Sequence, residues 1–303
     1  MSFISYAQNF EDVMLWRALQ HVPQGFYIDV GANDPEVDSV TKAFYDRGWH
    51  GINIEPVPQW FAKLEQERPR DVNLQMAVGA EVGEMLFYEV PSTGLSTGRG
   101  EIAKAHEVDR GFAVYERVVH VDTLTSIYRR AGAMPVHFLK VDVEGFEKQV
   151  LEGIDFSVLR PWILVIESTR PLTPEQDHQA WEHLLLVAGY VPVYFDGLNR
   201  YYLAPEHLDL RSHFAVPPHV FDQFTLSGDA SNNYSGRMRK KVCEVEAYAQ
   251  VAEARVLALE ERCAALLQSR SWRWTAPLRS GVAFAGYVAG RLGALLGLKK
   301  KNN

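Results

Sequence analysis

Four acidic residues stand at the ends of apolar runs, where they could bind a ligand or move a proton. Each lies in the last positions of a run of strand-forming residues or directly after it; the four are Asp29, Glu55, Asp142 and Glu167. In parallel sheets, ligands bind beyond the carboxyl ends of the strands, near the place where the strand order reverses. One acid at a strand end is common, but four on one rim predict a binding site for a polar ligand.

The segment Asp29-Val-Gly31-Ala-Asn33 follows the first apolar run. Glycine lets a backbone approach a ligand closely, and asparagine tolerates a left-handed turn. The segment is neither a G-x-G-x-x-G fingerprint nor a phosphate-binding P-loop, so a ligand without phosphate fits better. Glu55, 26 positions after Asp29, could accept hydrogen bonds from both hydroxyls of a ribose. Together they suggest S-adenosylmethionine, with Asp29 at its amino end. Taken singly, each acid could be an ordinary strand-end residue.

Asp142 and Glu144 form a second candidate pair. Residues two apart point to the same face if both have strand geometry. Such a pair could raise the pKa of one carboxyl and make it a general base, or hold a divalent cation that activates a hydroxyl. We favour Asp142 as the base or the substrate-orienting group, with Lys140 and Glu167 beside it. Glu144 could instead be an acid at a helix N-terminus.

Alternating apolar runs and helical patterns must position these side chains. Strands are predicted over 26–30, 51–55, 72–78, 118–121, 136–143 and 162–167, and a hairpin over 191–203. Pro58 is typical of a first helical turn, and Asp122 is predicted to cap a helix. The result is an α/β fold with a mostly parallel sheet and an antiparallel C-terminal hairpin.

Residues 79–120 are less regular and contain a loop rich in serine, threonine and glycine, 92–100. Ser96 and Thr97 in this loop are candidate acceptor-binding residues. The alternative is an ordinary surface loop.

Several of these motifs resemble the FkbM-type methyltransferases. The resemblance rests on Phe-Tyr-Ile-Asp-Val-Gly-Ala-Asn (26–33), Asn-Ile-Glu-Pro (53–56), Val-Asp-Thr-Leu (121–124) and, most specifically, Lys-Val-Asp-Val-Glu-Gly (140–145). It covers about residues 5–205. It implies a Rossmann-like class I methyltransferase that uses S-adenosylmethionine to methylate hydroxyl groups, often of sugars or polyketides. Asp34-Pro35 departs from the family, where many members continue with a second glycine.

The opening segment 5–12 also looks like this family's N-terminal segment, which would close over the cofactor. We therefore include Asp12 among the predicted cofactor-binding residues. Ala77, near the end of the third predicted strand, is included with Gly31 and Asn33.

The charge of the chain is unevenly distributed. The 303 residues carry a net charge of −7, but residues 262–303 contain eight Lys or Arg and no acid, so the rest carries −15. The 47% hydrophobic content excludes a disordered protein, and the acidic body argues against nucleic-acid binding. Two cysteines and an acidic start without an apolar core predict a cytoplasmic protein without a secretory signal.

Beyond a polar linker, 227–236, apolar residues recur at alternating intervals of four and three. Val242, Ala249, Val256 and Cys263 occupy the a positions of a heptad, and Met238, Val245, Ala252, Leu259 and Leu266 the d positions. We predict a coiled coil over 237–268 that pairs two chains. The alternative is a single helix lying on its own domain, 1–226.

The tail, 269–303, is basic and apolar. Residues 281–298 hold one charge, Arg291, and follow two tryptophans and three arginines in 270–279. Such a segment predicts contact with an anionic membrane at its cytoplasmic face, either as a short span or as a peripheral helix. The alternative is a glycine-rich tail that docks on a neighbouring subunit.

The leading hypothesis is an S-adenosylmethionine-dependent O-methyltransferase acting on a sugar of a bacterial surface glycan or a lipid-linked saccharide. The sequence leaves a metal requirement open. Methylation of a nucleic-acid base would need an Asn/Asp-Pro-Pro-Tyr/Phe run, which is missing. The rival from another class is a non-catalytic scaffold that binds the cofactor and recruits glycan-assembly partners through its coiled coil.

Overall fold

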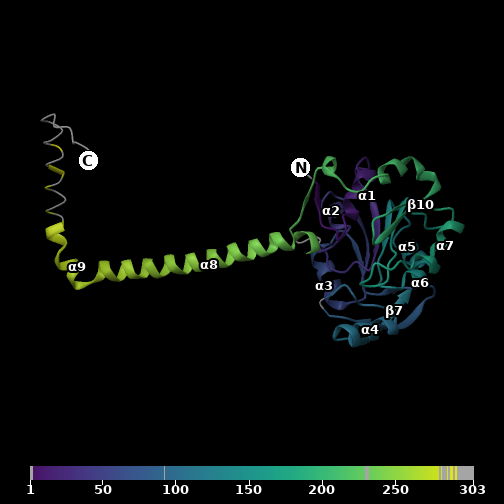
Figure 1. Ribbon diagram of the computed structural model, residues 1–303, viewed down its shortest axis with the longest axis horizontal. Coiled ribbons are helices and arrows are strands. Elements are labelled where there is room, and N and C mark those ends of the chain that lie inside the picture. Colours follow the sequence, from purple (N-terminus) through teal and green to yellow (C-terminus); the bar gives the residue numbers. More distant parts are fainter. Residues whose placement is uncertain are drawn as a thin grey trace. The chain divides into compact units, whose positions relative to one another are not determined.

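The computed structural model describes residues 3–91, 93–228, 232–279, 281, 285, 287, 288 and 291. It divides into two compact units, Met1–Gly236 and Arg237–Asn303. The first unit contains the sheets and their covering helices, and the second contains most of the long helix α8 (Figure 1).

A seven-stranded sheet within the described residues forms the centre of the first unit. Its strand order is β10-β11-β9-β8-β2-β3-β4. The strands from β9 to β4 are parallel, whereas β11 runs antiparallel to both β9 and β10. Their bounds are β2 (Phe26–Val30), β3 (His50–Ile54), β4 (Val72–Leu74), β8 (Phe138–Val141), β9 (Ile163–Glu167), β10 (Val191–Phe195) and β11 (Asn199–Leu203). The predicted α/β fold with a parallel sheet is confirmed.

The order of the strands reverses between β2 and β8. From β2 the chain builds outward through β3 and β4, and it then returns to the other side of β2 to build β8 and β9. Open α/β sheets bind ligands in the crevice at such a reversal. Asp29 in β2 and Asp142 directly after β8 therefore lie at the expected position.

Helices cover both faces of this sheet because successive strand residues point to opposite sides. Ile28 and Val30 belong to a core formed with helices α5 (Leu124–Arg130), α6 (Glu147–Glu152) and α7 (Glu182–Val187). Tyr27 belongs to the opposite core, formed with α1 (Glu11–Leu19), α2 (Lys42–Tyr45) and the 3₁₀ segment η2 (Pro205–Phe214).

Smaller elements flank the main sheet. Helix α3 (Pro58–Glu67) packs beside β4 and has Pro58 in its first turn, as predicted. Strands β5 (Ala77–Val78), β7 (Tyr115–Asp122) and β6 (Gly83–Glu89) form a second sheet, and β1 (Phe3–Ser5) pairs parallel with β12 (Phe224–Leu226). Helix α4 (Gly100–Arg110) and the 3₁₀ turns η1 (His178–Ala180) and η3 (Val220–Asp222) complete the unit.

Three local predictions were wrong. The strand predicted over 72–78 is two strands, because the chain turns where the Met76 N–H donates to the Leu74 carbonyl (3.2 Å) and β5 then joins the second sheet. Helix α5 is capped by Thr123, whose side chain accepts from the Ser126 N–H (3.2 Å), and Asp122 is the last residue of β7. The irregular stretch 79–120 contains β6 and α4.

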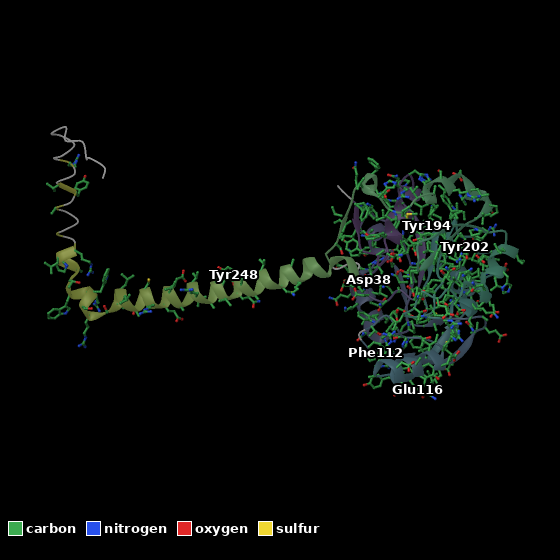
Figure 2. The ribbon with its side chains drawn as sticks, in the orientation of Figure 1. Asp38, Phe112, Glu116, Tyr194, Tyr202 and Tyr248 are labelled. Atoms are coloured by element: carbon green, nitrogen blue, oxygen red, sulfur yellow. The ribbon has the colours of Figure 1, made fainter. Side chains whose placement is uncertain are left out.

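Helix α8 (Asn232–Gln268) begins inside the segment predicted as a linker, and α9 (Arg270–Trp274) follows it. Every α8 side chain whose exposure is described is exposed, including Tyr248 (Figure 2). Most of the apolar segment 281–298 lies outside the described residues. Among the residues that are described, none of the helices has the length and hydropathy needed to span a bilayer.

Candidate active site

Gly31 lies directly after β2, at the reversal of strand order. Its N–H donates to the Ile54 carbonyl (3.0 Å), and its φ of +83° lies in the left-handed region. A Cβ at this position would lie 1.8 Å from the carbonyl oxygen of Asp142. Only glycine accommodates both the backbone conformation and the close approach of the chain after β8.

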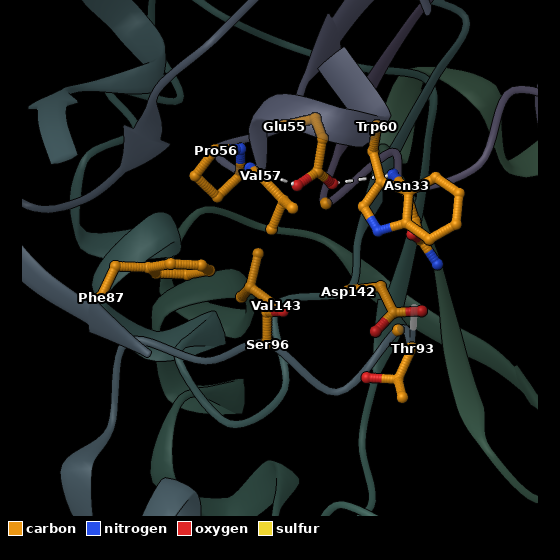
Figure 3. A pocket seen from close by; sticks show the side chains of 12 residues that line it. Asn33, Glu55, Pro56, Val57, Trp60, Phe87, Thr93, Ser96, Asp142 and Val143 are labelled. Atoms are coloured by element: carbon orange, nitrogen blue, oxygen red, sulfur yellow. Dashed lines mark hydrogen bonds between the residues drawn. The ribbon is translucent and has the colours of Figure 1, made fainter. Parts of the chain in front are cut away.

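Three cavities meet at Gly31, which lines all of them. An apolar cavity of about 30 Å³ is walled by Ala77 and Phe87. A cavity of about 50 Å³ beside it contains Glu55 and Trp60 (Figure 3). The third cavity, of about 490 Å³, has an acidic wall formed by Asp29, Asp142, Glu144 and Glu167, with Lys140 among them. The arrangement brings an apolar, a mixed and an acidic wall together at one residue.

Glu55 directly follows β3 and is 5% exposed. Its two carboxylate oxygens accept hydrogen bonds from the backbone N–H groups of Asn33 and Val57, both at 2.8 Å. Burial raises the pKa of the Glu55 carboxyl to about 7, although these two hydrogen bonds oppose the shift. Each oxygen keeps a lone pair for a further donor. In Figure 3 this carboxylate points into the cavity from one side and Asp142 lies on another.

Asp29 is 2% exposed and belongs to a buried polar network. Its Oδ2 accepts a hydrogen bond from Thr41 Oγ1 (3.2 Å), which in turn accepts one from the Arg68 guanidinium (3.0 Å). Oδ1 of Asp29 has no hydrogen-bond partner among the described residues. Burial raises the pKa of this carboxyl, with Lys140 and Arg68 opposing. A cationic donor in the 490 Å³ cavity would satisfy the free oxygen.

Lys140 and Asp142 form an ion pair at the end of β8. The ammonium lies 2.8 Å from Oδ2 of Asp142, and the lysine residue is 7% exposed. Burial acts to lower the pKa of Lys140, but the charges of Asp142 and Asp29 outweigh it and raise the pKa. The lysine therefore remains charged and holds the Asp142 carboxylate in place.

Asp142, Glu144 and Glu167 offer carboxylate oxygens that all lie within 4.8 Å of one another. Glu167, the last residue of β9, is 7% exposed, and its Oε2 has no hydrogen-bond partner among the described residues. Burial and the charge of Asp142 raise the pKa values of both Glu144 and Glu167. Three carboxyl groups this close together in one wall of the cavity could bind a cation or transfer a proton.

The backbone that places Glu144 in this cluster is a turn and not the extended strand considered from the sequence. Strand β8 ends at Val141, and Glu144 adopts a left-handed conformation with a φ of +50°. Strand geometry therefore does not extend to Glu144, and the condition under which the pair would share a strand face is not met. A tight turn brings the two carboxylates together instead. Glu144 is also three residues before α6, so it does not lie in the first turn of that helix.

The loop after β6 forms part of the cavity wall. Ser96 lines the cavity next to Glu55, and its Oγ accepts from the Val90 N–H (3.0 Å). Thr97 is fully buried and donates from Oγ1 to the Glu144 carbonyl (2.8 Å). Ser96 thus faces the candidate site, whereas Thr97 ties the loop to the turn that carries Glu144.

Asp12 is fully buried in α1 and lines none of the three cavities formed by the described residues. Its carboxylate accepts hydrogen bonds from Ser5 Oγ (2.8 Å) and from the backbone N–H groups of Tyr6 (2.7 Å) and Ala7 (3.3 Å). It thereby fixes the N-terminal segment, from which Gln8 lines the 490 Å³ cavity.

Trp60 and Phe87 line the site but did not emerge from the sequence. Phe87 lies in β6, inside the stretch that was read as irregular. Trp60 stands in the first turn of α3, two residues after Pro58. Trp60 follows a strand that leads into an acid, and it stands just inside the helix that begins at Pro58. This position is a sequence signal that could have identified Trp60.

The chain is similar to one known protein family. The methyltransferase FkbM domain matches residues 29–192, more than half of the chain. None of the curated proteins matches. Among solved structures, precorrin-6y C5,15-methyltransferase from Geobacter metallireducens is similar over 64% of this chain and 85% of its own, with 11% identity and a TM-score of 0.32.

Proposed function

Because this chain belongs to the FkbM methyltransferase family, we propose that it transfers a methyl group from S-adenosylmethionine to a hydroxyl group. We further propose that the hydroxyl belongs to a sugar of a bacterial surface glycan or a lipid-linked saccharide. The observation that carries the proposal is the meeting of an apolar, a mixed and an acidic cavity at Gly31. Methyltransferases of this kind generally use S-adenosylmethionine.

The residues present fit this cofactor. The apolar side chains of Ala77 and Phe87 would pack against a purine ring, and the buried carboxylate of Glu55 can accept hydrogen bonds from ribose hydroxyls. Asp29 offers an unpartnered oxygen in the acidic cavity for the amino group. Gly31 keeps the backbone free of a side chain where the cavities meet.

Bound S-adenosylmethionine supplies the methyl group, whose bond to sulfur breaks as the acceptor oxygen forms its new bond. The chain must orient the acceptor hydroxyl and receive or direct its proton. Asp142 is suited to this role because Lys140 fixes one of its oxygens at 2.8 Å while the residue lines two of the cavities. Ser96 and Glu167 would contact the acceptor.

The cofactor assignment is tested by calorimetric titration of S-adenosylmethionine into the full chain. Glu55→Ala should weaken binding markedly, because it removes an acceptor for ribose hydroxyls. Asp142→Ala should retain binding and abolish turnover. Glu65→Ala, which removes an exposed acid of α3, should leave both unchanged. Absence of binding at millimolar cofactor would refute the proposal.

The acceptor is sought by a radiolabelled methyl-transfer screen of nucleotide sugars and lipid-linked oligosaccharides. The screen also separates the enzyme from the alternative scaffold. A scaffold would bind the cofactor but transfer no methyl group to any member of the screen, even at saturating cofactor.

We propose that α8 pairs two chains in a parallel coiled coil. Its heptads carry valine at two a positions, Val242 and Val256, and leucine at two d positions, Leu259 and Leu266. These side chains are between 49% and 58% exposed in the single chain, and β-branched residues at a with leucine at d favour a dimer. Sedimentation of the full chain against a chain ending at Gly236 tests this pairing.

We also propose that the basic tail, 269–303, brings the enzyme to the cytoplasmic face of a membrane. The support is its composition, with seven cationic residues and no acid in 269–303. Vesicles with and without anionic lipid should distinguish the full chain from a chain ending at Gln268. Equal binding by the two chains would contradict the assignment.

A further inference from the structure

We propose that Asp142, Glu144 and Glu167 together bind one divalent cation of the Mg²⁺ or Mn²⁺ class beside the methyl acceptor. This inference rests on the proposed O-methyl transfer and assigns to the acidic cavity the group that activates the hydroxyl. The three carboxylates come from separate parts of the fold: the end of β8, the turn after it and the end of β9. All three line the same 490 Å³ cavity.

The spacing of the oxygens matches a coordination sphere. One carboxylate oxygen from each residue lies within 4.8 Å of the other two. Oxygen ligands held about 2.0–2.6 Å from a cation lie about 3–5 Å from one another. Three oxygens this close can share one ion once their side chains rotate toward it.

A second observation points to a missing ligand. Glu167 is 7% exposed, yet its Oε2 has no hydrogen-bond partner among the described residues, and Oε2 of Glu144 is likewise buried and unpartnered. Anionic oxygens buried in this way are costly unless they are paired or coordinate a metal. The nearest fixed cation, Lys140, donates its described hydrogen bond to Oδ2 of Asp142. The oxygens of the two glutamates need another positive partner.

The net charge of the three carboxylates and Lys140 also favours a bound divalent cation. Once ionised, the three carboxylates of this cluster and the ammonium of Lys140 leave two formal negative charges within the cluster. A divalent cation neutralises them, and oxygen-only donors select the Mg²⁺ and Mn²⁺ class over zinc or copper. Asp142 then acts as a ligand that orients the acceptor through the ion, rather than as the general base.

The ion would also determine which acceptor molecules bind well. Three protein oxygens leave further positions of an octahedral sphere open, and Mg²⁺ commonly fills such positions with water and substrate oxygens. Coordination lowers the pKa of a bound hydroxyl, so its proton can pass to cavity water before the oxygen attacks the methyl carbon. Two neighbouring oxygens can chelate the ion. We therefore expect acceptors with vicinal hydroxyls, such as sugar diols, to be preferred over isolated alcohols.

The test titrates Mn²⁺ into the full chain, freed of metal by EDTA, and follows the loss of the free-ion paramagnetic resonance signal. Wild type should bind one Mn²⁺ per chain, and Mg²⁺ should compete. Since loss of a mere outer-shell partner of a metal costs about 10–100-fold in affinity, Glu144→Gln and Glu167→Gln should each weaken Mn²⁺ binding at least about tenfold. Glu65→Gln, a matched change at an exposed position, should bind like wild type.

Thermal unfolding of each variant shows whether its fold is intact. The variant Glu167→Asp keeps a carboxylate, so it should recover part of the Mn²⁺ affinity that Glu167→Gln loses. The inference is overturned if wild type binds no stoichiometric Mn²⁺, or if folded Glu144→Gln and Glu167→Gln bind it as well as wild type. Because Mn²⁺ is titrated without cofactor or acceptor, this result is independent of S-adenosylmethionine binding. The two proposals can therefore fail separately.

Discussion

The ammonium group of Lys140 lies 2.8 Å from Oδ2 of Asp142, at the point where the order of the strands reverses. The lysine side chain is 8% exposed and the aspartate side chain 27%. This is a largely buried ion pair whose partners stand two residues apart, one in β8 and one directly after it. It fixes the position of the Asp142 carboxylate, and Asp142 lines two of the cavities that meet at Gly31.

Lys140→Met should destabilise the protein, because it leaves Asp142 without its ion-pair partner and Asp29 with only the more remote charge of Arg68. We expect a loss of about 3 kcal/mol in the free energy of unfolding, as for other broken buried pairs. Chemical denaturation at pH 7 measures it. Lys148→Met breaks the exposed pair with Glu152 (3.7 Å) and should cost less than about 1 kcal/mol. Equal effects of the two changes would show that the buried pair adds nothing.

Gly31→Ala should be much more damaging than Gly48→Ala. Both glycines have left-handed φ angles, +83° and +89°, so both substitutions introduce backbone strain of about 1–2 kcal/mol. At Gly48 a Cβ meets nothing within 4 Å, whereas at Gly31 it meets the Asp142 carbonyl at 1.8 Å. The clash should cost about 1–3 kcal/mol more. Unfolding free energies of the two variants give the difference, and similar values would contradict the close approach.

Binding of S-adenosylmethionine should weaken as the pH falls through 7. Burial raises the pKa of Glu55 to about 7, so its carboxyl is increasingly protonated below that pH. Ribose hydroxyls need the carboxylate as an acceptor, and a binding site that must lose a proton loses about tenfold in affinity per pH unit below its pKa. Calorimetry at pH 6 and pH 8 measures the change.

The control for this pH dependence is Glu55→Gln, which does not titrate. It should bind more weakly at pH 8 and retain only the pH dependence that comes from other groups of the protein and the ligand. An unchanged pH profile in Glu55→Gln would show that another group is responsible.

Mild oxidation of the full chain should link two copies through Cys263. Both cysteines are free and exposed, but Cys263 occupies an a position of the heptads, whereas Cys243 occupies b on the outer face. In a parallel, in-register dimer, equivalent a residues face each other. Non-reducing electrophoresis should show a dimer for wild type and Cys243→Ser, and a monomer for Cys263→Ser. Linkage that survives Cys263→Ser would contradict this register.

The central sheet could be predicted because its strands are short, apolar and separated by clear helical patterns. The strand-end acids could also be identified, since a parallel sheet places the carboxyl ends of its strands at one edge. Asp29, Asp142 and Glu167 do line one cavity, and Glu55 lines the adjoining one. These residues could be identified from the local apolar pattern together with the rule that parallel sheets bind ligands at the carboxyl ends of their strands.

What escaped prediction depends on contacts between distant segments. Phe87 belongs to a strand that is stabilised by pairing with β7, some thirty residues later in the chain. The convergence of Glu144 on Asp142 depends on a left-handed turn, which strand periodicity does not anticipate. The burial of Asp12 depends on β1, whose partner β12 lies more than 200 residues away.

The pairing of β1 with β12 has a mechanical consequence. Strand β12 ends at Leu226, shortly before α8 begins, and the Ser227 N–H donates to the Ser5 carbonyl (3.0 Å). The segment that continues from Ser5 carries Gln8 into the wall of the 490 Å³ cavity. Part of a load applied to the C-terminal extension would therefore reach that wall through two short paired strands. Tethering the enzyme by its extension would thus pull on the same segment that borders the proposed acceptor site.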